Sequence, residues 1–249
     1  MKTFGLIGYP LKQSFSQKFF SEKFESEGME ARYLNFPITS IDEFNGLLKH
    51  HPYLAGLNVT IPYKELVIPY LDEINEVAKA IGAVNVIKFK HINNKTHLIG
   101  YNTDTIGFIN SIKPLLKASH TKALILGTGG AAKSVAYSLK KLGITYRFVS
   151  RNPTEPSQVS YANLTSEILD TYHIIVNTSP IGMYPNIDEY PDIPYQHLSP
   201  DHLLYDVVYN PELTKFLELG AKQGATIKNG LEMLYIQAEE SWKIWNSEN

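Results

Sequence analysis

Short runs of apolar residues alternate along the chain with longer segments in which apolar residues recur at helical spacing. Alternation of this kind is typical of α/β proteins, in which strands and helices follow one another. Strands are predicted for residues 4–8, 32–36, 57–61, 83–87, 123–126, 144–150 and 203–208. Residues 174–183 and 226–230 are each predicted to contain a strand that runs into a turn. Helices are predicted for residues 17–24, 41–49, 73–81, 131–142 and 213–223, after residues 100–107 towards residue 116, and from residue 231 onwards. The pattern therefore predicts an α/β fold.

The stretch that ends at Lys64 carries the first candidate chemistry. Apolar and polar residues alternate before Pro62, so a strand would place Asn58 and Thr60 on one face. Pro62 ends this strand because it has no amide proton for the sheet. An amide, a hydroxyl and an ammonium group at one strand end suit a polyhydroxylated small molecule and a proton transfer to it. An edge strand with solvated polar residues and a surface lysine is the alternative for this stretch alone.

Three polar residues near helix starts have two possible roles each. Ser14 and Ser16 follow the first strand, and Ser16 is predicted to cap the next helix, since a serine hydroxyl accepts from free amides there. Alternatively, both serines point into a cleft. Asp104 either caps the helix that starts beside it or takes part in chemistry. A hairpin turn is predicted at residues 91–95.

The sharpest local signal is a glycine-rich turn after the strand at residues 123–126. Gly127, Gly129 and Ala132 form the pattern G-x-G-x-x-A directly before a predicted helix. Gly127 allows the tight turn, Gly129 lets the backbone approach a pyrophosphate, and Ala132 lets the helix pack closely on the sheet. Amides at the helix start then face the phosphates. We therefore predict a dinucleotide-binding site at this turn.

The end of the following strand distinguishes between two dinucleotides. NAD sites of this kind carry an acidic residue about 20 residues beyond the glycine turn, where it binds the ribose hydroxyl. This chain has Ser150 and Arg151 there, with no acidic residue before Glu155. Because a guanidinium group suits the extra phosphate of NADP, we predict NADP as the cofactor. An ordinary surface arginine is the alternative interpretation of Arg151.

Composition argues against several other classes of protein. The 249 residues are 43% hydrophobic and 19% charged, which suits one or two packed domains. A net charge of −2 gives no basic surface for nucleic acid, cysteine is absent, and the eight histidines lack metal-ligand spacing. No apolar run reaches the about 20 residues of a membrane span, and none near Met1 suits a secretion signal. We expect a cytoplasmic protein without a metal site, and without nucleic acid or membrane as partners.

Taken together, motifs across nearly the whole chain resemble those of the shikimate dehydrogenase family. Residues 56–64 (GLNVTIPYK) resemble its lysine motif, and residues 100–104 (GYNTD) resemble its aspartate motif. Further matches, in order and with similar spacing, are residues 83–85, 177–179, 182–185, 206–209 and 230–237. Each motif alone is weak, but their common order is specific.

This resemblance implies two domains and a cleft between them in which Lys64 and Asp104 lie together. Residues 1–103, with the C-terminal helix at 231–249, would form the substrate domain. Residues 104–230 would form a Rossmann-type NADP-binding domain. The residues expected at NADP are Gly127, Thr128, Gly129, Gly130, Ala131, Ser150, Arg151, Asn177, Thr178, Ser179, Met183, Val207 and Gly230.

The activity implied by the family is the reversible, NADP-dependent reduction of 3-dehydroshikimate to shikimate, a step towards chorismate and the aromatic amino acids. Lys64 would donate a proton in reduction and accept it in oxidation, and Asp104 would orient the hydroxyl and Lys64 or share the proton. The residues expected at the substrate are Ser14, Ser16 and Tyr209 for the carboxylate, and Asn58, Thr60, Asn85 and Gln237 for the ring hydroxyls.

Two alternatives remain beside this function. One is a broader quinate/shikimate dehydrogenase, and the other is a nucleotide-binding regulator that kept the fold without turnover. Retention of both Lys64 and Asp104 argues against the regulator, because a protein that merely binds needs neither. A monomer or a homodimer is expected.

The chain departs from the family pattern at two places. The family has histidine before the two serines, proline after them and histidine-asparagine further on, where this chain has Gln13, Gln17 and Phe19-Phe20. Ser150 likewise replaces an asparagine that precedes the arginine in the family. Since both serines and Arg151 remain, the first departure bears on substrate affinity more than on the chemistry.

Overall fold

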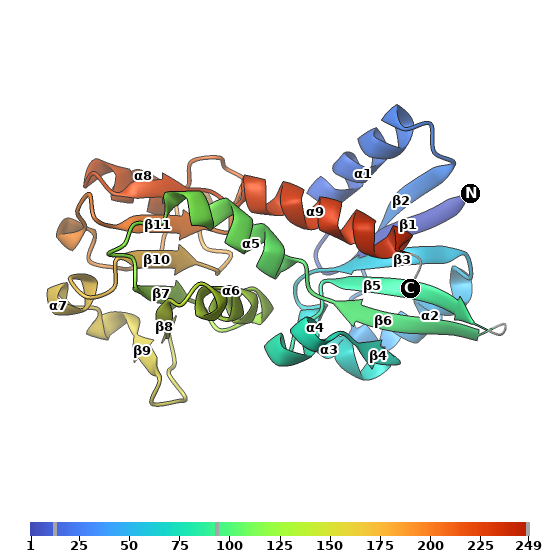
Figure 1. Cartoon of the computed structure of the whole chain (residues 1–249), viewed down its shortest axis with the longest axis horizontal. Coiled ribbons are helices and arrows are strands. Elements are labelled where there is room, and N and C mark those ends of the chain that lie inside the picture. The colour runs from blue at the N-terminus through green and yellow to red at the C-terminus, as the bar shows by residue number, and fades with distance from the viewer. Residues whose placement is uncertain (12–13, 93–94, 248–249) are drawn as a thin grey trace. The chain divides into compact units, whose positions relative to one another are not determined.

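The computed structural model describes residues 1–11, 14–92 and 95–247, and the chain divides into two compact units (Figure 1). The first unit comprises Met1–Thr103 and Gln237–Asn249, and the second comprises Asp104–Ile236. Each unit contains one six-stranded sheet. The hairpin turn predicted at residues 91–95 includes residues 93 and 94, which lie outside the described residues.

The sheet of the first unit has the strand order β2-β1-β3-β5-β6-β4. Its strands are β1 (Lys2–Ile7), β2 (Ala31–Phe36), β3 (Leu54–Val59), β4 (Glu73–Ile74), β5 (Val86–Ile92) and β6 (Lys95–Tyr101). Its helices are α1 (Phe15–Ser26), α2 (Phe44–His50), α3 (Tyr63–Leu66) and α4 (Glu76–Ile81), with short 3-10 helices at Ile41–Glu43 and Ile68–Tyr70. β1 and β3 are parallel and pair Ile7 with Val59, so the segments that follow them leave the sheet side by side.

Apolar side chains cover both faces of this sheet. Because neighbouring residues of a strand point to opposite faces, Phe4 and Leu6 of β1 pack into one cluster, with Phe20, and Ile7 packs into another, with Leu57. A strand buried on both faces has a continuous apolar run instead of strict alternation. This explains the apolar run at the start of the sequence.

Helix α9 (Leu231–Asn246) is shared between the two units. Met233 packs into a core cluster of the second unit, whereas Ala238 and Trp245 pack into the cluster of Phe4 in the first. The division therefore falls inside α9, between Ile236 and Gln237, and not at residue 231 as predicted.

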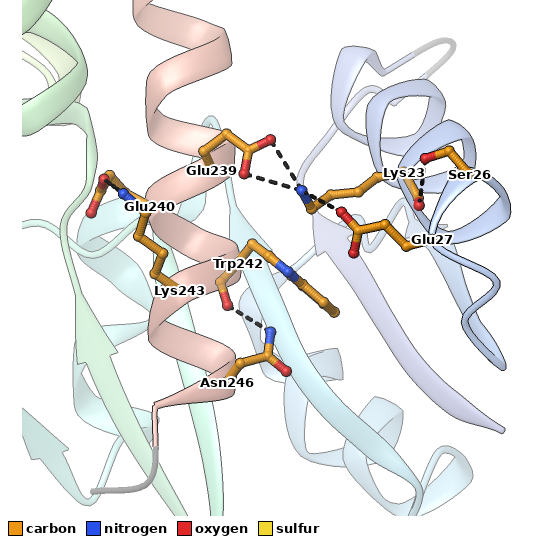
Figure 2. Close-up of polar contacts among 8 residues, drawn as sticks. All are labelled: Lys23, Ser26, Glu27, Glu239, Glu240, Trp242, Lys243 and Asn246. Carbon is orange, nitrogen blue, oxygen red and sulfur yellow. Dashed lines mark hydrogen bonds and ion pairs between the residues drawn. The ribbon is translucent and has the colours of Figure 1, made fainter.

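A charged contact joins the later part of α9 to α1 (Figure 2). Lys23 of α1 lies 3.2 Å from both carboxylate oxygens of Glu239 and 2.9 Å from Glu27. Burial lowers the pKa of Lys23, but its bonds to the two carboxylates outweigh burial and raise that pKa overall. The contact adds a polar link beside the aromatic packing of Trp245.

The second unit has an entirely parallel sheet with the order β12-β11-β10-β7-β8-β9. Its strands are β7 (Lys122–Leu126), β8 (Thr145–Ser150), β9 (Gln158–Ser160), β10 (Ile174–Asn177), β11 (Leu203–Asp206) and β12 (Thr226–Lys228). Its helices are α5 (Asp104–Ile112), α6 (Gly130–Lys141), α7 (Ser166–Leu169) and α8 (Lys215–Lys222), with 3-10 helices at Lys113–Leu115, Tyr161–Asn163 and Tyr195–His197. The order reverses between β7 and β10, as in doubly wound dinucleotide-binding sheets, so the predicted Rossmann-type fold is confirmed.

Several predicted element boundaries were wrong. The strand expected to reach residue 61 ends at Val59, because the chain turns there and the Tyr63 amide donates to the Thr60 carbonyl. The helix expected at residues 73–81 is a short strand followed by α4, which starts after Asn75 because this side chain caps it. None of the helices in the described part of the chain is long and apolar enough to cross a membrane.

Candidate active site and cofactor site

Hydrogen bonds fix the backbone at Lys64 and at its neighbour Tyr63. It is the second residue of α3, and its neighbour Tyr63 is buried and donates to the Ile38 carbonyl at 2.6 Å. The Lys64 carbonyl accepts from the Val84 amide at 2.7 Å. These bonds fix the backbone of Lys64 in α3, and the residue is half-buried.

A buried polar cluster lies at the ends of β3 and β6. Thr103 donates its amide to Asn85 Oδ1 at 2.8 Å, and Asn85 Nδ2 donates to Thr103 Oγ1 at 3.0 Å. Asn85 Nδ2 also lies 3.5 Å from Gln237 Oε1 of α9. Two residues predicted to bind ring hydroxyls are thus brought together within the first unit. Asp104 follows Thr103 directly and is the first residue of α5 in the second unit.

Asn58 belongs to the same cluster and is only 4% exposed. Its Oδ1 accepts from the Tyr33 hydroxyl at 2.7 Å, and its Nδ2 donates to Ser241 Oγ at 3.1 Å. Burial raises the pKa of the Tyr33 phenol well above its usual value, and a hydrogen bond with Ser16 opposes this shift. The Asn58 amide therefore supports the buried cluster, and a contact with substrate stays a prediction.

The serine that caps α1 is not the one predicted. Ser14, not Ser16, caps α1, because its Oγ accepts from the Gln17 amide at 3.0 Å. Ser16 lies within the first turn of α1 and is buried. Tyr209, the third residue expected at the carboxylate, belongs to the second unit, whereas both serines belong to the first.

The glycine turn after β7 has the geometry of a phosphate cradle. Gly127 has a φ of 118°, which disfavours other residues, and a Cβ there would lie 2.8 Å from Thr178 Oγ1. At Gly129 a Cβ would meet nothing within 4 Å, so open space lies before α6, which starts at Gly130. Thr178 donates its hydroxyl to the Leu126 carbonyl at 2.8 Å and ties β10 to β7. The cradle fits the pyrophosphate of a dinucleotide.

Other residues expected at the cofactor gather at the carboxyl ends of the same parallel strands. Asn177 ends β10, and its Oδ1 accepts from Ser179 Oγ at 2.7 Å. The Val207 amide donates to the Asn177 carbonyl at 2.9 Å, and the Gly230 amide donates to the Val208 carbonyl at 3.1 Å. Ser150 ends β8, Arg151 is exposed directly after it, and Met183 is 44% exposed.

A buried carboxylate organises this strand edge. Asp206 accepts from Thr214 Oγ1 at 2.6 Å, from the Val208 amide at 3.0 Å and from Asn177 Nδ2 at 3.0 Å. Burial raises the pKa of Asp206 to about 7, and these three hydrogen bonds oppose the shift. Asp206 thereby fixes Asn177 and the start of α8, where Thr214 is the N-cap.

Comparison with known proteins decides the family of this chain. The model of the shikimate dehydrogenase substrate binding domain matches residues 6–87. Shikimate dehydrogenase (NADP(+)) of Staphylococcus haemolyticus is 39% identical over 252 residues, which cover 97% of this chain and 91% of that protein. This chain belongs to the shikimate dehydrogenase family.

Solved structures of the shikimate dehydrogenase family have the same fold. Shikimate dehydrogenase 1 of Peptoclostridium difficile matches with a TM-score of 0.86 at 36% identity, covering 98% of this chain and 91% of that chain. The Thermus thermophilus enzyme, in complex with NADP(H) and shikimate, matches with a TM-score of 0.85 at 28% identity, covering 99% of this chain and 94% of that chain.

Four residues of the site in this member of the shikimate dehydrogenase family were missed from the sequence. They are Tyr33, Thr103 and Ser241 in the buried cluster and Asp206 at the cofactor edge. Ser241 lies one helical turn after Gln237 and donates to its carbonyl at 2.7 Å, so helical spacing was an available signal. For Asp206, the available signal was its position as an acidic residue at the end of an apolar strand. No group of three or more potential ligands suits a metal ion among the described residues.

Asp206→Asn is expected to gain stability relative to the native protein as pH rises. An unfolded aspartate titrates near pH ~3.9, and Asp206 does so at about 7, so the folded state binds its proton more tightly. Between these values the native protein loses about 1.4 kcal/mol of stability per pH unit through this group, and the loss is complete above the higher value. The asparagine variant lacks this loss.

Urea unfolding of both proteins at roughly pH 5 and pH 8 measures the effect. Asp188→Asn, at an exposed carboxylate, is the control and should show no such trend. A stability difference between native protein and Asp206→Asn that stays constant with pH would contradict the assignment.

Proposed function

We propose that this protein is an NADP-dependent shikimate dehydrogenase, which reversibly reduces 3-dehydroshikimate to shikimate in the biosynthesis of chorismate and the aromatic amino acids. The observation that carries the proposal is similarity over nearly the full length to enzymes of that name. The placement of Lys64 after β3, in the same unit as the polar cluster of Asn85 and Gln237, supports it.

The second unit would hold NADP through the cradle and the strand ends around it. The amides at the start of α6 would bind the pyrophosphate, and Arg151 and Ser150 would bind the ribose phosphate. The other residues proposed at the cofactor are Gly127, Thr128, Gly129, Gly130, Ala131, Asn177, Thr178, Ser179, Met183, Val207 and Gly230. When bound, NADPH supplies the hydride that reduces the carbonyl carbon of the substrate.

The first unit would hold the substrate and supply the proton. As the carbonyl oxygen becomes a hydroxyl it takes up one proton, which Lys64 donates; in the reverse direction Lys64 accepts it. Asp104 would orient the hydroxyl and the Lys64 ammonium group. The residues proposed around the substrate are Ser14, Ser16 and Tyr209 at the carboxylate, and Asn58, Thr60, Asn85 and Gln237 at the ring hydroxyls.

A comparison of shikimate with quinate as substrate distinguishes the proposed function from its two alternatives. Purified protein is assayed for NADPH formation from NADP with shikimate and, separately, with quinate. A shikimate dehydrogenase favours shikimate strongly in kcat/KM, whereas a broader quinate/shikimate dehydrogenase turns over both. A regulator without turnover binds NADP and converts neither, and that result would refute the proposal.

Arg151→Ala is expected to remove most of the preference for NADP over NAD. A hydrogen bond between charged groups contributes about 1.5–3 kcal/mol, which corresponds to a roughly tenfold to hundredfold preference in kcat/KM. Steady-state kinetics with both cofactors measures it, and activity with NAD should hardly change. Arg147→Ala, on the strand β8 that Arg151 follows, is the control and should keep the preference. Equal use of both cofactors by the native protein would contradict the role of Arg151.

The protein would act in the cytoplasm as a monomer or homodimer, with shikimate and 3-dehydroshikimate as its small-molecule partners and without nucleic acid or membrane. Size-exclusion chromatography with light scattering decides between monomer and homodimer. A larger assembly would contradict both.

A further inference from the structure

A closed ring of hydrogen bonds surrounds the hydroxyl of Ser14. Ser14 donates to Asn35 Oδ1 at 2.9 Å and accepts from the Gln17 amide at 3.0 Å. Asn35 in turn donates its Nδ2 to Gln17 Oε1 at 2.9 Å. Asn35 is on β2 and Gln17 is in the first turn of α1, so two rigid elements fix the ring.

In this ring the Ser14 hydroxyl already donates its only proton, which a carboxylate ligand would need. A serine hydroxyl has one proton to donate, and an ionised carboxylate can only accept. Because that proton is directed at Asn35 Oδ1, a substrate carboxylate at Ser14 competes with the Asn35 side chain for it. Asn35 does not simply turn away, since its amide nitrogen is bonded to Gln17.

Gln17 supplies both parts of this arrangement. Its backbone amide holds Ser14 Oγ, and its side chain holds Asn35. Gln17 therefore holds both partners of the contact between Ser14 and Asn35. Ser16 lies outside the ring and is bonded to Tyr33.

We propose that Asn35, held by Gln17, is a specificity-determining residue that competes with the substrate carboxylate for the Ser14 proton and weakens the binding of shikimate. The inference rests on the proposed function, in which Ser14 lies at the carboxylate. Ser16 and Tyr209 then contribute more than Ser14 to carboxylate binding in the native protein, and Ser14 contributes fully once Asn35 is removed.

Asn35→Ala tests the inference through both the KM and the Kd for shikimate. We expect both constants to fall about three- to tenfold, the range that the net contribution of an ordinary hydrogen bond gives. The kcat and the KM for NADP should stay within about twofold. Calorimetric titration gives the Kd for shikimate without relying on turnover. Asn45→Ala, at an exposed asparagine of α2, is the matched control and should change neither constant.

A double-mutant cycle with Ser14→Ala shows whether the gain comes from Ser14. In the native background, Ser14→Ala should raise the KM for shikimate less than about twofold, and in the Asn35→Ala background it should abolish the gain. Gln17→Leu, which keeps the backbone cap but releases Asn35, should lower the KM in the same direction by a smaller factor. If a thermal melt shows that Asn35→Ala is not folded, the KM of Gln17→Leu tests the inference instead.

Three results overturn the inference. If the KM and Kd for shikimate do not change in Asn35→Ala, the ring is structural. If they rise, Asn35 directs the Ser14 proton at the carboxylate instead of competing for it. If they fall equally with and without Ser14, the gain does not pass through this hydroxyl. A native protein that does not oxidise shikimate at all would instead refute the proposed function, and the inference would fall with it.

Discussion

Lys64→Ala is expected to lower kcat for shikimate oxidation by about 10²–10⁴-fold while the KM for shikimate changes far less. Lys64 is the proposed group that takes the proton from the substrate hydroxyl, and proton transfer contributes to the transition state more than to binding. Its backbone is fixed by the hydrogen bond of the buried Tyr63 and by the bond from the Val84 amide. Steady-state kinetics in both directions measures the effect.

Two further variants separate the charge of Lys64 from its bulk. Lys64→Met keeps much of the volume without the ammonium group and should lose as much kcat as the alanine variant. Lys79→Ala, at an exposed lysine of α4, should behave as the native protein. A raised KM with kcat nearly intact would mean that Lys64 anchors a substrate hydroxyl, and Asp104 would then be the better candidate for proton transfer.

Trp245→Ala is expected to destabilise the protein by about 3–5 kcal/mol, the range for removal of a large aromatic side chain from a core. Trp245 is 8% exposed, lies 4.9 Å from Phe4 and 5.2 Å from Phe20 between ring centroids, and donates its Nε1 to the Ile87 carbonyl at 3.1 Å. Its indole packs so closely on β3 that a Cβ at Gly56 would lie 2.4 Å from Nε1. Urea unfolding measures the change.

The same substitution should weaken the site, because α9 carries Gln237 and Ser241 to the buried polar cluster. We therefore expect the KM for shikimate to rise in Trp245→Ala. Trp242→Ala, at a half-buried tryptophan of the same helix, is the matched comparison and should be milder in both measurements. A loss below about 1 kcal/mol for Trp245→Ala would contradict the anchoring role.

Local patterns were sufficient to predict the parts of the fold that local physics determines. The turn at Gly127 and the helix behind it follow from a buried strand that runs into small residues, and the structure has both. The cap of α1 was assigned to Ser16 instead of Ser14, because the choice depends on which hydroxyl lies within reach of the Gln17 amide. The choice between two nearby capping residues depends on three-dimensional positions that a local sequence pattern does not contain.

Contacts between distant parts of the chain account for most of what the sequence did not predict. Asp206 and Asn177 meet because β10 and β11 are neighbours, and Tyr33 reaches Asn58 across a sheet whose strand order differs from chain order. The division of α9 depends on which core receives each of its side chains. The short strand β9 was missed because three residues give too short a pattern.

Hydride transfer from NADPH to 3-dehydroshikimate is the most direct test of the proposed function. Purified protein is incubated with 3-dehydroshikimate and NADPH deuterated at the transferable position, each stereoisomer separately, and the product is analysed by mass spectrometry and NMR. We predict shikimate that carries deuterium on the carbon with the new hydroxyl, from one stereoisomer alone, and almost none from Lys64→Met in the same time. Absence of shikimate, or shikimate without deuterium from either stereoisomer, would contradict the proposed function.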